Sequence, residues 1–384
     1  MIKRKFKLPG VEELTKDQDR VLRLPEDGQY LVVGGPGTGK SVVALLRTMK
    51  YLKNNNYVFL TYNRLLLSTS LQLVQQNLES KTLTSFIYTE YNRYFKSNTP
   101  QISPYKPDYD KIIEDFKSLN KNSISLHLII DEGQDMPPKF YEALMYLGIE
   151  NFFIVADQNQ QITEDNSSRQ ELTDLLNLEV EDVIELKENF RNSLPIARFA
   201  NTFFTDPSSP KPALPPESRV SLGIPILYKY EHYQKCVEVI LREYDRDPRN
   251  LIGVVVANNN RRNTYVDALN KMDIELDNPK PTISTYSARD KQDSNIDFAY
   301  SGIVVLNDKS IKGLEFDIVF IIIDGFTIYN NDLDSMKKRF YVMSSRAIKK
   351  LVLFQHIGYK GDVDKILIKD ENILQRKRLN DGKK

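Results

Sequence analysis

The feature that most constrains this chain is a glycine-rich stretch, GGPGTGKS at residues 34–41, which follows the apolar run YLVV at residues 30–33. Glycine allows the tight backbone turns that point successive N–H groups into one anion-sized concavity. Lys40 would then reach the β- and γ-phosphates, and the Ser41 hydroxyl would ligate Mg²⁺. The helix expected after the loop would present its positive end to the same charge. The stretch therefore predicts a strand–loop–helix unit that binds a nucleoside triphosphate.

Short apolar strands alternate with helical patterns along the whole chain, which is typical of parallel sheets with crossover helices. The expected strands of the first half are residues 30–33, 57–61, 126–130 and 152–156. Those of the second half are residues 251–256, 302–306, 318–323 and 351–354. The pattern predicts two parallel α/β lobes of similar size. A ligand is expected at the carboxyl ends of the strands, and therefore in the cleft between the lobes.

The bulk properties fit this organisation and restrict the setting. A chain of 384 residues is long enough for two domains, each with its own core. The net charge of +1 means that any site for a polyanion must be a local patch. The single cysteine excludes an internal disulfide, and we expect neither a signal peptide nor a membrane-spanning stretch, because the basic first residues lack an apolar region and no apolar run is long enough. We therefore expect a cytoplasmic location and no membrane partner.

Two adjacent acids, Asp131 and Glu132, follow the apolar run LII at residues 128–130. At the carboxyl end of a strand beside a phosphate loop, one acid can hold Mg²⁺ while its neighbour polarises the attacking water. This interpretation makes Asp131 the metal residue and Glu132 the general base. An acidic helix cap after a buried strand would give the same two residues, so this string taken alone leaves both readings open.

Further strings resemble the superfamily 1 helicases of the UvrD/Rep type, in the order expected for that family. They are DEGQD at residues 131–135, ENFRNS at 188–193, KGLEF at 312–316 and FYVMSSRA at 340–347. The resemblance implies two RecA-like P-loop domains with an ATP cleft between them. It also implies ATP and Mg²⁺ as ligands and single-stranded DNA, or RNA, as a partner.

The same resemblance implies domain boundaries. The N-terminal RecA-like domain would span residues 1–185 and include a small helical insertion at about residues 87–123. The C-terminal RecA-like domain would span residues 186–384 and carry the arginine finger. Neither segment leaves room for the large accessory subdomains of bigger family members.

The resemblance also assigns roles to single residues. In catalysis, Glu132 is joined by Gln160 as the γ-phosphate sensor, Arg191 as a γ-phosphate contact and Arg346 as the arginine finger. The residues assigned to the nucleotide are Gln18, Gly35, Gly37, Thr38, Gly39, Lys40, Ser41, Phe190, Gly313 and Glu315. Among these, Gln18 would read the adenine edge, Phe190 would stack on the adenine, and Glu315 would lie at the ribose. The residues assigned to single-stranded nucleic acid are Thr61, Tyr62, Asn63 and Thr82.

The two arginines have a physical role that fits these assignments. ATP hydrolysis places extra negative charge on the transferring phosphoryl group, and a planar guanidinium meets that charge with paired donors. Arg191 and Arg346 belong to the second lobe, whereas Lys40 belongs to the first, so hydrolysis would require a closed cleft. Taken singly, each has a structural alternative: a surface salt bridge for Arg191 and a helix-terminal cation for Arg346.

Some positions depart from the family pattern on the nucleic-acid side. After Ile162 the chain has TEDN where larger relatives place an aromatic pair that stacks on bases. Before KGLEF, Asn307-Asp308-Lys309 replaces the usual T-x-H. Asp308 beside a polyanion would be unfavourable unless its carboxylate is turned away.

Two functions remain open on the sequence. The first is an ATP-dependent single-strand translocase or helicase that steps 3′ to 5′. The second is an ATP-switched regulatory subunit that controls a partner such as a nuclease, in the manner of compact proteins of bacterial antiphage modules, without unwinding. A small-molecule kinase or an unrelated P-loop ATPase would leave Arg191, Arg346 and the KGLEF string unexplained.

Overall fold

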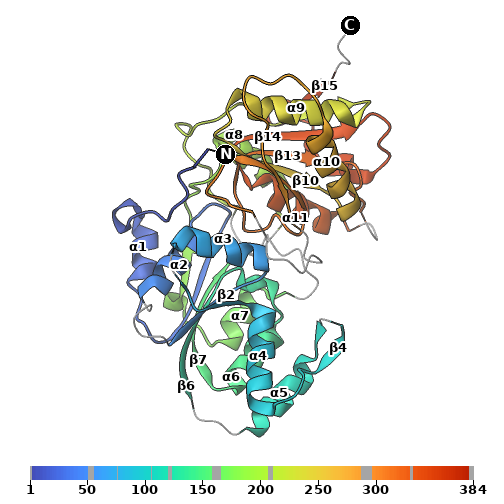
Figure 1. Cartoon of the computed structure of the whole chain (residues 1–384). Coiled ribbons are helices and arrows are strands. Elements are labelled where there is room, and N and C mark those ends of the chain that lie inside the picture. Colours follow the sequence, from blue (N-terminus) through green and yellow to red (C-terminus); the bar gives the residue numbers. More distant parts are fainter. Residues whose placement is uncertain are drawn as a thin grey trace. The chain divides into compact units, whose positions relative to one another are not determined.

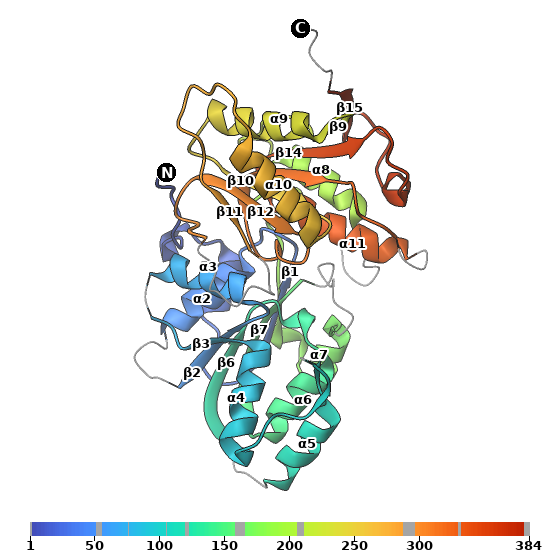
Figure 2. The same ribbon diagram turned by 45° about the vertical axis from the view of Figure 1, so that its right-hand side comes forward.

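The computed structural model describes residues 2–50, 56–75, 77–104, 106–119, 123–157, 166–205, 211–286, 296–328 and 332–379. The chain divides into two compact units, Lys7–Lys187, and Met1–Phe6 together with Glu188–Lys384. Figures 1 and 2 show that each unit is a sheet with helices packed against it. Both units are parallel α/β structures, which confirms the predicted fold class.

The first unit is built on a six-stranded sheet in the order β3-β2-β6-β7-β1-β8, with every pair parallel. In that order the strands are Ser80–Thr82, Tyr57–Thr61, Ile124–Ile130, Ile149–Ala156, Gln29–Gly34 and Val183–Leu186. The inner strands each contain a buried, largely apolar run because helices cover both faces of the sheet.

Seven helices cover the sheet of the first unit in the described part of the chain. They are α1 (Lys16–Leu22), α2 (Lys40–Lys50), α3 (Arg64–Val74), α4 (Leu83–Phe95), α5 (Tyr109–Ser118), α6 (Pro138–Tyr146) and α7 (Arg169–Leu175). Alternate residues of β1 divide between two cores: Leu31 and Val33 pack with α4, α5, α6 and α7, whereas Tyr30 and Val32 pack with α1 and α2. This division follows from the period of two in a strand.

The second unit is built on a seven-stranded parallel sheet in the order β11-β12-β10-β13-β14-β9-β15. In that order the strands are Ile283–Thr285, Gly302–Asn307, Leu251–Val256, Phe316–Ile322, Ala347–His356, Ile226–Tyr230 and Gln375–Arg378. Helices α9 (Tyr233–Arg246) and α10 (Asn259–Lys271) share one core with the sheet. Helices α8 (Leu194–Ala200) and α11 (Leu333–Ser344) pack on each other and on β14.

All eight strands expected from the sequence are present, but the described residues of the two large sheets include five others that were not expected: β3, β8, β9, β11 and β15. Four of these five are the edge strands of the two sheets. An edge strand is covered less completely and therefore lacks a long apolar run. The sequence of β15, QRKR, has no apolar residue at all.

Two local features differ from the sequence expectation. The first residues of the chain pack in the second unit rather than the first: the Arg4 guanidinium lies 2.7 Å from the Asp317 carboxylate, and the Arg4 N–H donates to the Ala299 carbonyl. The insertion between β3 and β6 is not purely helical, because an antiparallel hairpin of β4 (Gln101–Ser103) and β5 (Lys106–Pro107) lies between α4 and α5.

Within the described ranges, no helix combines the length and the apolar character needed to cross a membrane.

Candidate nucleotide and nucleic-acid site

The glycine-rich loop joins β1 to α2, as the sequence predicts. Gly37 and Gly39 have φ angles of 74° and 87°, a region that side chains rarely tolerate. A Cβ atom on Gly39 would also lie 2.3 Å from Nε2 of Gln18. Lys40 is the first residue of α2, so the N–H groups that begin this helix belong to the loop itself. The loop therefore has the backbone of an anion cradle.

Gln18 is fixed against this loop from α1. Its Nε2 atom donates to the Thr38 carbonyl at 3.0 Å, and its Oε1 atom accepts from the Thr15 N–H at 3.0 Å. Thr15 caps α1 in return, because its hydroxyl accepts from the Gln18 N–H. The residue expected to read the adenine edge thus lies beside the phosphate loop.

Lys40 is held at the floor of the loop. Its Nζ atom donates to the Gly34 and Gly35 carbonyls, each at 2.8 Å, and lies 3.6 Å from the Asp157 carboxylate. Asp157 follows β7, the strand next to β1, and is buried. The sequence analysis gave Asp157 no role. The signal for it was the ADQNQQ string at residues 156–161, in which only Gln160 was singled out.

Asp131 and Glu132 lie at the carboxyl end of β6, on the other side of β7. Burial and the neighbouring Glu132 carboxylate raise the pKa of Asp131 to about 7, against the lowering effects of the Ser41 hydroxyl and Lys40. The Oδ2 atom of Asp131 is buried and has no hydrogen-bond partner among the described residues. A buried carboxylate oxygen without a partner, next to a serine hydroxyl, is a donor set that fits a hard divalent cation such as Mg²⁺.

Glu132 is oriented by Gln134, a residue of the DEGQD string to which the sequence assigned no role. The Gln134 side chain donates to Glu132 Oε2 at 2.5 Å and accepts from the Asp157 N–H at 3.0 Å. Gln134 is completely buried, so it links the carboxylate after β6 to the acid after β7. Glu132 itself has a φ of 58°, an uncommon value for a residue with a side chain. Such strain is typical of positions that serve a site.

The four residues predicted to contact nucleic acid meet at the same edge of this sheet. Thr61 and Thr82 are register partners at the carboxyl ends of β2 and β3. Asn63 and Thr82 cap α3 and α4 by accepting the Leu66 and Ser85 N–H groups. Thr61 is fully buried, and Tyr62 packs partly against the core. All four therefore have local structural roles, and their contact with nucleic acid stays a prediction.

The second unit gathers the predicted arginines around one acid. Arg191 donates from Nε and Nη2 to Glu315 Oε1, at 2.8 and 2.5 Å. The Asn192 amide, next in sequence, donates to the Ser345 and Ala347 carbonyls, which flank Arg346. Segments 188–193 and 340–347 are thereby joined into one structure. The ion-pair alternative for Arg191 is thus present in the structure, with the partner that the family resemblance places at the ribose.

Arg346 follows α11 and is fully buried, and its Nε atom donates to the Val342 carbonyl in the last turn of that helix. A guanidinium at this place also satisfies a helix-terminal carbonyl. This bond shows that Arg346 acts as a cation at the end of α11, as the structural alternative expected. Its role as an arginine finger stays a prediction.

In the second unit, the candidate residues lie at the other edge of the sheet from the one that the sequence predicts. Glu315 and Arg346 immediately precede β13 and β14, which are adjacent and parallel, so both residues lie at amino ends of strands. The sequence placed the ligand at carboxyl ends throughout. The structure places Glu315 and Arg346 at amino ends instead, because the segment after β12 returns across the sheet to the start of β13. The position of the ligand stays a prediction. Gly313, with a φ of 78°, lies in this returning segment.

Phe190 is 38% exposed, as a ring that stacks on a base requires. The Arg219 guanidinium lies over the ring, 5.5 Å from its centroid. Asp308 is turned away from solvent and pairs with Arg339 at 2.6 Å, so its charge is neutralised. Gln160 lies outside the described residues.

The fold defines a protein of two parallel α/β units, with a glycine-rich loop after a central strand of the first. The chain matches the family model described as "Schlafen group 3, DNA/RNA helicase domain" over residues 28–227. The match covers more than half of the chain, and the chain belongs to this helicase-like family.

Other comparisons add little. No curated protein matches the chain. Among solved structures, a similar chain is the C-terminal domain of a possible DNA helicase from Lactobacillus plantarum WCFS1. It is 13% identical with a TM-score of 0.34, over 49% of this chain and 98% of that one. A likeness at this level carries no argument about fold or function.

Proposed function

We propose that this protein hydrolyses ATP and uses the energy to move along single-stranded nucleic acid, as a translocase or helicase of the UvrD/Rep type. The observation that carries the proposal is the arrangement at one edge of the first sheet. There the carboxyl ends of β1, β7 and β6 bring together the phosphate loop, Asp157 and the Asp131–Glu132 pair. Membership of a DNA/RNA helicase domain family supports nucleic acid as the partner.

Each side chain at this edge has a proposed task. Lys40 exchanges the Gly34 and Gly35 carbonyls for the β- and γ-phosphates of ATP. Ser41 and Asp131 are the residues that would hold Mg²⁺, which neutralises phosphate charge when bound. Glu132 accepts a proton from the attacking water, and its bond from Gln134 keeps its carboxylate oriented for that transfer.

The second unit supplies the positive charge that the transition state needs. Arg191 and Arg346 are buried in most of their length and held by hydrogen bonds within the unit, so their positions are preorganised. In this proposal Arg191 leaves or shares Glu315 to meet the γ-phosphate, and Glu315 then contacts the ribose. The resemblance of the KGLEF string to the 3′-to-5′ branch of the family supports that direction of stepping.

The test is ATP turnover with and without defined single-stranded DNA and RNA oligomers. The proposal expects turnover to rise severalfold with at least one of them, because strand binding organises the site. Equal rates with and without both polymers would contradict a translocase. Direction follows from streptavidin displacement: a 3′-to-5′ translocase removes streptavidin from the 5′ end of an oligomer and leaves it at the 3′ end.

A second candidate is an ATP-switched regulatory subunit that controls a partner effector such as a nuclease. It is favoured by the small size of the insertion between β3 and β6, whose described residues form α4, one hairpin and α5. Purification from the native host separates the two candidates. A stable complex with an effector whose activity follows ATP, together with turnover that ignores nucleic acid, would favour the regulator.

A further inference from the structure

A hollow on the second unit lies at the opposite edge of its sheet from Arg346 and Glu315. Its volume is about 630 Å³, within the range of small-ligand sites. It is formed at the carboxyl ends of β9, β13 and β14, by Tyr230, Asp324 and His356 and the segments that follow them. Because β14 has ten residues, this edge is roughly 30 Å from Arg346. The hollow is therefore distinct from the predicted ATP residues.

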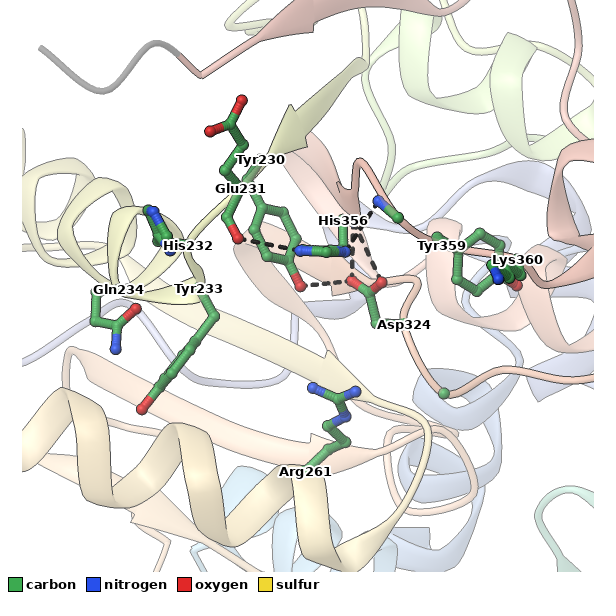
Figure 3. A pocket seen from close by; sticks show the side chains of 12 residues that line it. Tyr230, Glu231, His232, Tyr233, Gln234, Arg261, Asp324, His356, Tyr359 and Lys360 are labelled. Atoms are coloured by element: carbon green, nitrogen blue, oxygen red, sulfur yellow. Dashed lines mark hydrogen bonds between the residues drawn. The ribbon is translucent and has the colours of Figure 1, made fainter.

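The floor of this hollow is a closed hydrogen-bond cluster. The Tyr230 hydroxyl donates to Asp324 at 2.6 Å, and the His356 N–H donates to the same carboxylate at 3.2 Å. The His356 ring lies between the Glu231 carbonyl, 3.1 Å from Nε2, and the Gly358 N–H, which donates to Nδ1 at 3.0 Å. Figure 3 shows these bonds as dashed lines between the labelled side chains. The polar groups of Tyr230, Asp324 and His356 are thus hydrogen-bonded to one another or to neighbouring backbone, which makes the floor of the hollow rigid.

The rim, in contrast, offers groups that are not used. Arg261 reaches from α10 toward the cluster of Tyr230, Asp324 and His356 (Figure 3). Its guanidinium makes no hydrogen bond or ion pair with any other described residue, and neither does the Lys360 amino group. The nearby Glu231 carboxylate is held by Arg378 at 2.5 Å and so does not compete for these cations. The rim therefore carries two cations, and the acid of the floor that faces Arg261, Asp324, is already hydrogen-bonded by Tyr230 and His356.

An aromatic surface lies beside these cations. Tyr233 is the first residue of α9, and its half-buried ring contacts Tyr265 edge-on, at 6.1 Å between centroids. The exposed amide of Gln234 follows it. A ring face, an amide and two free cations are the groups that recognise the base and the phosphate of one nucleotide.

A second basic hollow lies at the same edge of the sheet. It has a volume of about 350 Å³ and is lined by Lys229, Ile357, Arg376, Lys377 and Arg378. Lys229 precedes Tyr230 in β9, and Ile357 follows His356 at the end of β14, so both hollows lie at the carboxyl ends of these two strands. Membership of a DNA/RNA helicase domain family favours one unit of a polymer over a free small molecule as the occupant.

We propose that the hollow at Tyr233, Arg261 and Lys360 binds one nucleotide unit of single-stranded nucleic acid, with the phosphate on the two cations and the base on the tyrosine. The inference rests on the proposed function, because it names where the second unit holds the strand. The same chemistry would accept a free nucleoside monophosphate, and the experiment separates the two sources.

The experiment measures binding of a fluorescent single-stranded 20-mer by anisotropy over a range of salt concentrations. Variant Arg261→Ala/Lys360→Ala should bind the strand more weakly and lower the slope of log K against log salt by about 0.7, since one neutralised phosphate is lost. Tyr233→Leu should weaken binding roughly 5- to 150-fold, and Tyr233→Phe should restore it. Lys271→Ala is the matched control, because Lys271 is an exposed cation at the other end of α10.

Each outcome has a separate meaning. If the full-length protein binds the strand and the double variant matches it in affinity and slope, the inference is wrong while the proposed function stands. If uridine monophosphate binds at the hollow and the strand does not compete with it, a free nucleotide is the ligand and the polymer proposal is overturned. If the protein binds neither strand nor mononucleotide, the inference and the proposed function both fail. ATP turnover without nucleic acid should be the same in all variants.

Discussion

The two units have the same parallel architecture but place their candidate residues at opposite ends of their strands. In the first unit the phosphate loop, Asp131 and Asp157 all follow strands, where backbone N–H groups at the start of the next helix point at a ligand. In the second unit Glu315 and Arg346 precede strands. An amino edge lacks that field of N–H groups, so only long cationic side chains can supply positive charge there. This difference explains why the candidate residues of the second unit that carry positive charge are arginines.

The units also differ in how their charges are satisfied. Asp131 in the first unit is buried, its pKa is raised to about 7, and one of its oxygens has no partner among the described residues. Arg191 in the second unit already holds an acid, Glu315. In the first unit a buried carboxylate oxygen therefore has no partner among the described residues, whereas in the second unit Arg191 is already paired.

The largest effect is expected from Arg346→Ala. If the amino edge of the second sheet contacts the transferring phosphate, ATP turnover should fall about 10³- to 10⁵-fold while ATP affinity changes little. Turnover and ATP binding are measured side by side, with thermal unfolding as a check because Arg346 is buried. The exposed Arg198→Ala in α8 is the control. If ATP affinity falls and turnover per bound ATP is unchanged, Arg346 only binds the nucleotide. The amino edge of the second sheet then has no role in catalysis.

A somewhat smaller effect is expected from Glu132→Gln in the first unit. The amide keeps the shape and can still bond to Gln134, but it cannot accept a proton, so turnover should fall about 10²- to 10⁴-fold. ATP affinity should be retained, as equilibrium binding of a fluorescent ATP analogue would show. The exposed Glu181→Gln serves as the matched control. Unchanged turnover in Glu132→Gln would remove this residue as the base and leave the acidic cap as its role.

The smallest effect concerns stability and tests the division into units. Arg4→Met removes one of the two cations paired with Asp317, the other being Lys349, and should lower the free energy of unfolding of the second unit by about 1–2 kcal/mol. Lys5→Met is the control, because Lys5 is exposed. Chemical denaturation monitored at both units measures the change. An equal loss in the first unit would contradict the assignment of residues 2–6 to the second.

The ion pair between Arg4 and Asp317 also predicts how the stability difference between the original protein and Arg4→Met depends on pH. Burial raises the pKa of Asp317, but Arg4, Lys349 and the Leu251 N–H outweigh it and hold the pKa below its usual value. The carboxylate therefore contributes its full stability above its ordinary pKa and loses it as the pH falls through the lowered one. The Arg4→Met difference should be constant near neutral pH and shrink in acid. A difference that grew in acid would contradict this sign.

The sequence predicted the interior strands of both sheets except β9 and missed the edge strands, for a physical reason. A central strand such as β10, LIGVVV, is buried on both faces and must be apolar throughout, so it can be recognised without its neighbours. The strand β15, QRKR, pairs on one side only and is defined by its register with β9. The four polar residues of β15 carry no pattern from which this register with β9 could be predicted.

The candidate site divides in the same way. Lys40, Ser41, Asp131 and Glu132 were predicted because each belongs to a short string whose spacing sets its chemistry. Asp157 and Gln134 were not, because their roles depend on β7 lying between β1 and β6. Only that strand order brings the Asp157 carboxylate within 3.6 Å of the Lys40 amino group.

By itself, the sequence determined that this chain folds into two parallel α/β units and that its phosphate loop lies after a strand of the first. Local backbone conformation and strand burial are properties of a few consecutive residues, so a single chain is enough to read them. Only the tertiary structure decided which edge of the second sheet carries Glu315 and Arg346, and that Tyr233, Arg261 and Lys360 share a hollow. Those relations join residues far apart in the chain, and they follow from strand order and crossover geometry.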